Sequence, residues 1–238
     1  MPAAGVGARM QADVPKQYLT VGGKTILEHT LERLVAAQPF KQLLLCVSAQ
    51  DEQVVPLLQG NKVLASLLTT KVAKGDIKTV LGGETRAHSV SNGLAALADR
   101  AKANDWVLVH DAARPCIDPR DIRQLCNLVN QDEVGGILAI RAQDTLKYVE
   151  GDTIQRTLNR EPIWQAQTPQ LFRYGVLVNA LAQAQKNKLL VTDEASAIEH
   201  LGALPKVVEA RYPNIKITTK ADLALATVLL AGNKLQDS

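Results

Sequence analysis

The sequence is poor in aromatic residues, which make up only 3% of its 238 residues. Proteins that hold single-stranded nucleic acids use aromatic side chains as stacking platforms for the bases. The charge is also nearly balanced, with 27 basic and 24 acidic side chains, so the chain has no strong field to hold a polyanion. These two deficits argue against a nucleic-acid-binding protein. Any phosphate chemistry must come from cations placed locally.

Cysteines and long apolar runs are scarce as well. The three cysteines are Cys46, Cys116 and Cys126, and no pair has the Cys-x-x-Cys spacing. This pattern argues against a disulfide framework and against a zinc site. The chain has no run of 18 apolar residues, and its beginning lacks the basic and apolar regions of a secretion signal. We therefore expect a cytoplasmic protein with no membrane segment.

Short apolar runs alternate along the chain with segments whose apolar residues recur at helical spacing. This alternation predicts an α/β fold, with a mostly parallel sheet covered by helices on both faces. The composition and length fit a single domain over residues 1–238. The expected strands are residues 43–47, 77–81, 106–109, 136–140, 206–209 and 214–218. The expected helices are residues 26–35, 54–58, 84–100, 119–130, 173–186, 193–201 and 220–231.

One segment, residues 141–163, interrupts this order with simple alternation of side chains. Thr145, Lys147 and Val149 alternate before the turn at Glu150-Gly151-Asp152, and a second alternating run follows. The pattern predicts a β-hairpin with a glycine-containing turn. Such a hairpin is either a surface decoration or a dimerisation arm, because its exposed edges need covering.

The first candidate site is the stretch Pro2-Ala3-Ala4-Gly5-Val6-Gly7-Ala8-Arg9-Met10, followed by Lys16. Small residues and glycines let backbone N–H groups approach a phosphate closely. The dinucleotide-binding fingerprint fails, because Met10 stands at its third glycine, and a P-loop fails, because Tyr18 stands at its first glycine. The alternative is a flexible amino-terminal tail.

The second candidate is Gly82-Gly83-Glu84-Thr85-Arg86-Ala87-His88-Ser89, which joins an expected strand to an expected helix. Glycines before a helix N-terminus form a cluster of backbone donors suited to a base or a phosphate. The alternative is a plain turn in which Glu84 helps to cap the helix.

The third candidate is Asp111, which comes just after the apolar strand 106–109. Open α/β sheets bind their ligands at this end of the strands, so Asp111 is placed to hold Mg²⁺ or a ribose hydroxyl. Alternatively, Asp111 forms an ion pair with Arg114 that fixes the loop. His110 could act as a general base, although a histidine at a strand end is more often a packed, hydrogen-bonded residue. No Gly-x-Ser-x-Gly motif supports a hydrolase triad.

Four further polar positions lie downstream: Arg160, Thr168, Thr192 and Lys216. Thr192 and the residue after it also suit the N-cap of the helix at 193–201. Lys216 alternates with two isoleucines, so its side chain faces away from theirs, toward either solvent or a cleft.

Six motifs together resemble one family, and they occur in the family's order over essentially the whole chain. They are Pro-Ala-Ala-Gly-x-Gly-x-Arg-Met with Pro-Lys-Gln-Tyr, Gly-Gly-x-x-Arg-x-x-Ser, Val-His-Asp-Ala-Ala-Arg-Pro, Thr-Pro-Gln-x-Phe, Thr-Asp-Glu-Ala-Ser and Asn-Ile-Lys-Ile-Thr. The chain resembles the 2-C-methyl-D-erythritol 4-phosphate cytidylyltransferases (IspD type). The resemblance implies a Rossmann-like nucleotidyltransferase fold. It also implies CTP and methylerythritol phosphate as substrates, Mg²⁺ as cofactor, and a homodimer whose β-arms reach the partner's active site.

The resemblance also implies roles for individual residues. Those it makes catalytic are Arg9, Lys16 and Lys216. Those it assigns to the nucleotide are Ala3, Ala4, Gly5, Gly7, Gly83, Arg86, Ser89 and Asp111, the last also as metal ligand. Those it assigns to methylerythritol phosphate are Thr145, Arg160, Thr168, Thr192 and Lys216, with Arg160 acting across the dimer.

The chain departs from the family pattern at Pro213, because an aspartate is expected just before Asn-Ile-Lys. Three other functions compete with this resemblance. A ribitol-5-phosphate cytidylyltransferase differs in the loops at Thr145, Thr168 and Thr192. A sugar-1-phosphate nucleotidyltransferase is disfavoured by the His-Asp-Ala-Ala-Arg stretch, and an inactive nucleotide-binding regulatory protein by the presence of the catalytic cations.

A final expectation concerns the beginning of the sheet. A phosphate-binding loop of this kind should follow a buried strand of about five or six residues, yet the stretch begins at Pro2. Without that strand, the neighbouring strands keep unpaired backbone groups. We expect the first strand to be missing, and an extended version to be more stable and more active.

Overall fold

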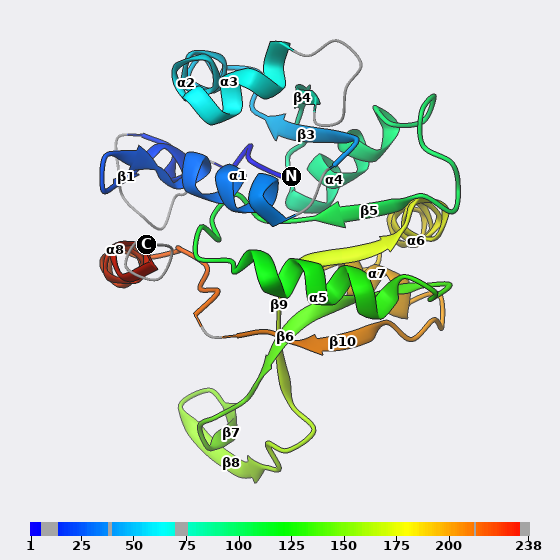
Figure 1. Cartoon of the computed structure of the whole chain (residues 1–238). Coiled ribbons are helices and arrows are strands. Elements are labelled where there is room, and N and C mark those ends of the chain that lie inside the picture. Colours follow the sequence, from blue (N-terminus) through cyan, green and yellow to red (C-terminus); the bar gives the residue numbers. More distant parts are fainter. Residues whose placement is uncertain (6–13, 38–39, 70–75, 212, 234–238) are drawn as a thin grey trace.

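The computed structural model describes residues 1–5, 14–37, 40–69, 76–211 and 213–233 (Figure 1). Its strands are β1 (Thr20–Val21), β2 (Lys24–Thr25), β3 (Gln42–Val47), β4 (Asp76–Leu81), β5 (Trp106–Val109), β6 (Gly135–Arg141), β7 (Leu146–Glu150), β8 (Thr153–Leu158), β9 (Trp164–Arg173) and β10 (Lys206–Glu209). Its helices are the 3₁₀ helix η2 (Lys16–Tyr18) and the α-helices α1 (Ile26–Ala37), α2 (Val54–Gly60), α3 (Lys62–Thr69), α4 (Arg86–Ala95), α5 (Pro119–Val129), α6 (Tyr174–Lys186), α7 (Glu194–Glu199) and α8 (Lys220–Asn233). The predicted α/β fold is confirmed.

The strands pair in both senses. Four strands form one sheet in the order β10-β6-β9-β5, and β3 pairs with β4 in a second sheet. The β3–β4 and β6–β10 pairs are parallel, whereas β9 runs antiparallel to both β5 and β6. The larger sheet is therefore mixed, because β5, β6 and β10 run in one direction and β9 runs against them. The sequence did not predict β9, so the prediction of a mostly parallel sheet is corrected at this strand.

Strand β9 escaped prediction because its sequence is rich in glutamine and contains Pro169. Proline cannot donate a hydrogen bond to a neighbouring strand, and inside a sheet it is confined to edges and bulges. The structure places Pro169 at such an irregularity. Residue 137 of β6 pairs with Gln170 and residue 139 with Ala166, so the register shifts between them.

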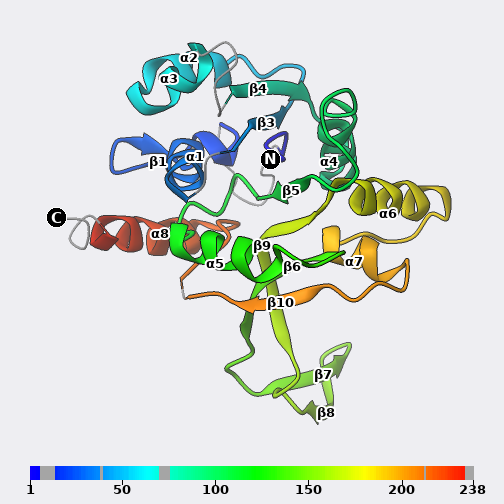
Figure 2. The same ribbon diagram turned by 45° about the vertical axis from the view of Figure 1, so that its right-hand side comes forward.

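Helices cover both faces of the larger sheet (Figure 2), so the side chains of its strands are buried on either side. Leu138 of β6 and Leu171 of β9 join the apolar cluster that contains the buried residues of α5. The neighbouring Ile137 and Phe172 join a separate cluster with α6 and α7. Successive residues of a strand point to opposite faces, which explains this division.

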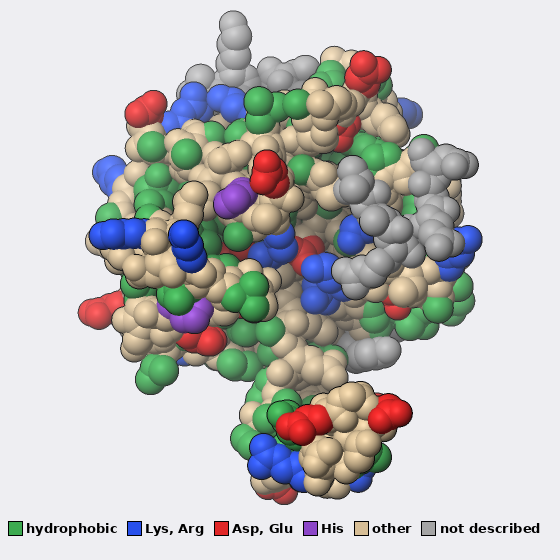
Figure 3. Space-filling model, turned by 180° about the vertical axis from the view of Figure 1, so that it is seen from behind, with side chains coloured by type: hydrophobic (Ala, Val, Ile, Leu, Met, Phe, Trp, Pro, Cys, Tyr) green, Lys and Arg blue, Asp and Glu red, His purple; other side chains and the backbone are tan. Residues whose placement is uncertain are grey.

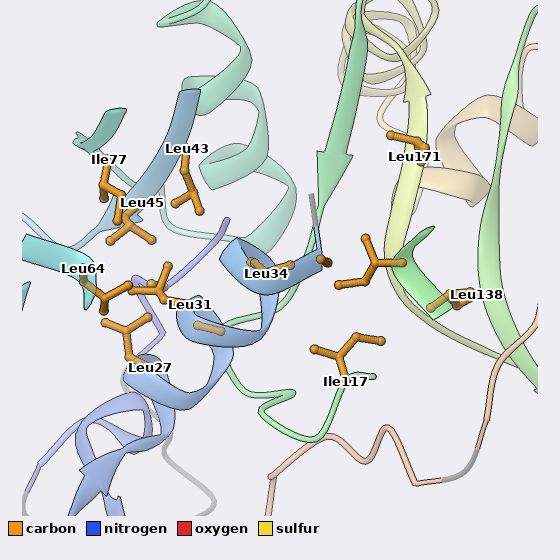
Figure 4. Close-up of a cluster of buried hydrophobic side chains, with 14 of the residues drawn as sticks. Leu27, Leu31, Leu34, Leu43, Leu45, Leu64, Ile77, Ile117, Leu138 and Leu171 are labelled. Carbon is orange, nitrogen blue, oxygen red and sulfur yellow. The ribbon is translucent and has the colours of Figure 1, made fainter. Parts of the chain in front are cut away.

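Helix α1 packs beside β3 in the first of these clusters. Leu27, Leu31 and Leu34 recur at helical spacing and are buried, as are Leu43 and Leu45 of β3 (Figure 4). The same spacing predicted the helix from sequence.

The amino-terminal residues run beside β3. Pro2 forms an isolated parallel bridge with Cys46, and the Ala3 N–H donates to the Cys46 carbonyl at 2.8 Å. A cavity of about 680 Å³ lies between β3 and β5, with Leu43, Leu94 and Leu108 among its lining residues. In the described part of the chain, β3 pairs with β4 and this bridge, and β5 pairs with β9. Among the described residues, no strand pairing joins β3 directly to β5.

The predicted hairpin is confirmed. Strands β7 and β8 pair antiparallel and project from the body of the molecule (Figure 1), and Gly151 in the turn has a left-handed φ of 62°. Its apolar side chains Tyr148, Val149 and Ile154 are exposed. We call residues 141–163 the arm.

The prediction of a strand at residues 214–218 is wrong. These residues form no strand, although Ile217 is fully buried beside α8 and β1. Among the described residues, no helix has the length and apolar character needed to cross a bilayer.

Candidate active site

Two of the predicted stretches meet at the ends of β3 and β4. A Cβ added at Gly82 would lie 2.6 Å from the Cβ of Ala4, so these backbones are nearly in contact. Thr85 caps α4 by accepting from the His88 N–H, whereas the sequence suggested Glu84 for that role. Ser89 is buried, and its hydroxyl accepts from the Gly83 N–H at 3.0 Å. Ser89 therefore holds the shape of the loop.

Asp111 lies at the centre of a group of charges just after β5. Its Oδ1 accepts from Arg86 Nε at 2.8 Å, and its Oδ2 lies 2.7 Å from Lys216 Nζ. Arg114, the partner considered from sequence, is more distant, with Nε 4.0 Å from Oδ2. Burial alone would raise the pKa of Asp111, but Arg86 and Lys216 outweigh it and hold that pKa well below its usual range.

Arg86 joins two carboxylates. Its Nη1 and Nη2 donate to Glu194 Oε1 and Oε2 at 2.7 and 2.9 Å, while its Nε bonds to Asp111. Burial lowers the pKa of the guanidinium, but the two carboxylates more than offset this and raise it. Arg86 thus stays charged, and most of its donors are already engaged within the protein. We call Arg86, Asp111, Arg114, Glu194 and Lys216 the charged cluster.

The cluster carries three cations and two carboxylates, so one positive charge is in excess. Buried ion pairs contribute little net stability, because desolvation offsets their attraction. Such an arrangement is better suited to binding an anion than to stabilising the fold. On one face of the molecule, basic and acidic side chains gather around a hollow above the arm (Figure 3).

The segment at 214–218 brings Lys216 to the cluster. The Ile217 N–H donates to the Ala113 carbonyl at 2.9 Å, and the Ile217 side chain is buried. Lys216 directs its Nζ to Asp111 Oδ2, at 2.7 Å, so its side chain turns into the charged cluster. Lys16 Nζ donates to the Ile217 carbonyl at 3.4 Å. Lys16 thus reaches the residue that directly follows Lys216 in the chain.

His110 is fully buried and supports the Asp111 loop. Its Nε2 lies 3.2 Å from the Arg114 carbonyl, and its Nδ1 lies 3.0 Å from Thr168 Oγ1. A carbonyl can only accept, so Nε2 carries the proton and Nδ1 accepts from the threonine hydroxyl. Burial lowers the pKa of His110 to about 4, which keeps the ring neutral near pH 7. This is the packed histidine considered above, and not a general base.

The other predicted site residues include some that the structure describes and some that it does not. Arg9 and Gly7 lie outside the described residues, whereas Ala3 and Gly5 are described, and the Ala3 carbonyl accepts from Gln17 Nε2 at 2.8 Å. Thr168 is buried and also accepts from the Asp111 N–H at 3.0 Å, so its hydroxyl is occupied within the protein.

Three of the residues predicted to bind methylerythritol phosphate are exposed. Thr145 and Arg160 belong to the arm, where Arg160 Nη1 donates to the Gln143 carbonyl. Thr192 lies before α7, whose N-cap is Asp193 with a complete capping box.

Sequence reasoning missed two members of this site. Glu194 reads as an ordinary acidic residue in the first turn of a helix, yet it is 1% exposed. Asn214 is also buried, and its Nδ2 donates to the Thr168 carbonyl at 2.8 Å. Both were visible only inside the motifs that carry the family resemblance, because their burial depends on contacts far apart in sequence.

The side chains of the cluster fit a metal ion that is held mainly by the phosphates of a bound nucleotide. Among the described residues, no three His, Cys, Asp or Glu side chains are grouped to hold a metal ion. Mg²⁺ is usually bound by one or two carboxylates together with substrate phosphates and waters. Asp111, ionised and next to the loop ends, is the carboxylate that fits this description.

Comparison with known proteins gives consistent relatives. The family model described as 2-C-methyl-D-erythritol 4-phosphate cytidylyltransferase (IspD) matches residues 1–232. Curated proteins of that name are similar to this chain. The one from Mannheimia succiniciproducens is 47% identical over 232 residues, covering 97% of this chain and 94% of the relative. The one from Vibrio vulnificus strain YJ016 is 44% identical over 235 residues, covering 98% and 94%.

Solved structures give the same result. The crystal structure of the Francisella tularensis 2-C-methyl-D-erythritol 4-phosphate cytidylyltransferase is 40% identical, with a TM-score of 0.77 and 96% of each chain covered. A crystal structure of a 4-diphosphocytidyl-2C-methyl-D-erythritol synthase is 36% identical, with a TM-score of 0.78, and covers 90% of this chain and 94% of that one.

Proposed function

The chain belongs to the IspD family of 2-C-methyl-D-erythritol 4-phosphate cytidylyltransferases, and we propose that the charged cluster and its neighbouring loops are its active site. The enzyme transfers CMP from CTP to 2-C-methyl-D-erythritol 4-phosphate in isoprenoid biosynthesis. The products are 4-diphosphocytidyl-2-C-methyl-D-erythritol and pyrophosphate. We propose that residues 1–238 form one nucleotidyltransferase domain.

The reaction needs positioned positive charge rather than a base. A phosphate oxygen of the acceptor attacks the α-phosphorus of CTP, and the bond to the β-phosphate oxygen breaks to release pyrophosphate. The attacking phosphate is already ionised, because its second pKa is about 6. Catalysis then depends on alignment and on neutralising charge at the phosphorus. A neutral, buried His110 is compatible with such a mechanism.

The observation that carries this proposal is the convergence of cations at the end of β5. Lys216 Nζ lies 2.7 Å from Asp111, and Lys16 reaches the carbonyl of the residue next to Lys216. We propose that Lys16 and Lys216, together with Arg9, neutralise the reacting phosphates. The backbone of Ala3, Ala4, Gly5 and Gly7 would cradle the triphosphate.

The cytidine would lie against the second stretch, at Gly83, Arg86 and Ser89. Because Arg86 and Ser89 are engaged inside the protein, we propose that they shape the pocket and that backbone groups contact the base. Asp111 would hold Mg²⁺, which when bound neutralises charge on the triphosphate.

We propose that methylerythritol phosphate binds between the cluster and the arm of a second subunit. Thr192 and Lys216 would contact it from the same chain as the cluster, and Thr168 would act through the Asp111 loop that its hydroxyl holds. Thr145 and Arg160 lie on the arm. An isolated two-stranded hairpin is marginally stable in water. The exposed Ile154, Val149 and Tyr148 support burial of the arm against another copy, as a homodimer.

We also propose that the enzyme works in the cytoplasm. None of the three cysteines forms a disulfide, and Cys46 and Cys116 are buried. Cysteines that form no disulfide are typical of a reducing compartment.

A pyrophosphate-release assay with CTP and Mg²⁺ tests the proposed acceptor. We expect release with methylerythritol phosphate and at most a trace with ribitol 5-phosphate at the same concentration. Faster release with ribitol 5-phosphate would contradict the assignment, and no release with either would reject a cytidylyltransferase.

A further inference from the structure

Glu194 is a buried carboxylate at the edge of the charged cluster, outside the set of residues that the sequence assigned to the site. It is 1% exposed, and both of its oxygens accept from the fork of Arg86. Burial raises the pKa of Glu194 and Arg86 opposes that rise, so the negative charge of Glu194 depends on Arg86. The two side chains form a bidentate pair, the strongest common geometry between arginine and a carboxylate.

We propose that Glu194 is a positioning residue that controls how Arg86 contacts Asp111. This inference rests on the proposed function, in which Asp111 takes part in binding the nucleotide and its metal. Glu194 occupies Nη1 and Nη2, so that Arg86 meets Asp111 through Nε alone, at Oδ1. The second oxygen, Oδ2, is thereby left to Lys216.

The chemistry of guanidinium explains why this division needs a second carboxylate. An arginine with one carboxylate neighbour prefers to bind both oxygens through two parallel N–H donors. If Glu194 lost its charge, Arg86 would be free to turn its fork toward Asp111 and to compete for Oδ2. Lys216 would then lose its partner, and any ligand of Asp111 would have to displace a bidentate arginine.

The position of Glu194 in the fold supports this role. It begins α7, where Asp193 is the N-cap and Gln170 accepts from the Ala195 N–H at 2.9 Å. The same glutamine donates to Asp193 at 2.8 Å. The start of α7 is therefore fixed to β9, and Glu194 presents both oxygens to Arg86 from a rigid support.

The test is a double-mutant cycle read out by CTP binding in the presence of MgCl₂, measured by isothermal titration calorimetry. The variants are Glu194→Gln, Arg86→Gln and the double variant, with Glu199→Gln on the exposed side of α7 as matched control. We expect Glu194→Gln to weaken CTP binding about tenfold, since charge-assisted hydrogen bonds contribute about that much. In the Arg86→Gln background the same change should weaken binding less than about twofold, because the two residues act as one unit. Glu199→Gln should bind as the unchanged enzyme does.

Several outcomes would overturn the proposal. An unchanged affinity in Glu194→Gln would do so, and so would an equal loss in both backgrounds, which would show that Glu194 acts independently of Arg86. If Glu194→Gln fails to fold, Glu194→Asp keeps the charge on a shorter side chain, and we expect an intermediate loss of CTP affinity. Unchanged affinity in a folded Glu194→Asp variant would then contradict the proposal.

The steady-state constants and one further variant separate this inference from the proposed function. A residue that only stabilises the fold would lower Tm without raising KM for CTP, whereas a positioning residue raises KM. If Asp111→Asn leaves CTP affinity and turnover unchanged, the proposed role of Asp111 fails. If Asp111→Asn is impaired and Glu194→Gln is not, only the inference about Glu194 fails.

Discussion

The charged cluster and the arm differ in how much of their surroundings one chain provides. In the cluster, Arg86, Asp111 and Lys216 come from three separate segments and bond to one another inside the same subunit. On the arm, Thr145 and Arg160 are exposed, and the arm projects from the body. A single subunit therefore assembles the whole charged cluster, but it leaves the two predicted substrate residues of the arm exposed.

The contrast suggests a division of labour between the two regions. The cluster resides on rigid elements, because His110 and Thr168 hold the Asp111 loop and α8 anchors the Lys216 segment. Rigid support of this kind gives precise placement of charge. The arm has little packing of its own, so its position would be set by whatever it contacts. On our account, chemistry belongs to the first region, and acceptor recognition is completed by the second.

The largest effect should come from removing a cluster-side cation. We expect Lys16→Ala to lower kcat by about three orders of magnitude, because a positioned charge on a phosphoryl group contributes that much to catalysis. CTP binding should remain measurable by calorimetry. Lys24→Ala is the matched control, since Lys24 forms a surface pair with Glu32. Near-normal turnover in Lys16→Ala would show that the cluster side does not carry the chemistry.

A second prediction compares stability in the two regions. Phe172 of β9 is fully buried in the apolar cluster that includes α6. Phe172→Ala should therefore lower the free energy of unfolding by about 3–5 kcal/mol at every protein concentration. Ile154 on the arm is 60% exposed. If the arm packs against a second copy as proposed, Ile154→Ser should destabilise only through a weaker dimer, with an effect that fades on dilution. Urea unfolding at several protein concentrations checks this, and a large loss for Ile154→Ser in dilute protein would contradict it.

A smaller effect is expected on the pH dependence of stability, through His110, which supports the Asp111 loop. His110 has its pKa lowered to about 4, so between about pH 6.5 and 4 the unfolded chain binds a proton that the folded chain does not. Stability should therefore fall as the pH is lowered through this range, by on the order of 3 kcal/mol from this group. Urea unfolding across the range should show a shallower slope for His110→Gln than for the exposed-site control His200→Gln. Equal slopes for the two variants would be evidence against a buried, neutral His110.

The sequence predicted the cluster side better than the details of the sheet. Apolar periodicity located α1 and β5, and the rule that ligands bind at strand ends located Asp111. Strand β9 was missed because Pro169 and its polar neighbours do not read as a central strand. Glu194 was missed because local sequence shows a helix start and says nothing of the arginine that buries it.

The arm was predictable as a hairpin, because alternation and a glycine turn are local signals. Its contacts were not, since those that we propose are made with a second chain. The same limit applies to Arg160, whose role follows from the family resemblance alone.

The most direct test mixes two impaired subunits. Lys16→Ala removes a cation from the cluster side, and Arg160→Ala removes the arm residue, which alone should raise KM for methylerythritol phosphate more than about tenfold. If Arg160 acts across the dimer, a mixed dimer contains one site with both native residues. An equal mixture that has exchanged subunits should then recover about one quarter of the activity of the unchanged enzyme, since half of the dimers are mixed. Recovery of this size supports completion of the site by a second chain. Mixed dimers, verified by native mass spectrometry, that show no activity beyond that of the two variants alone would contradict it.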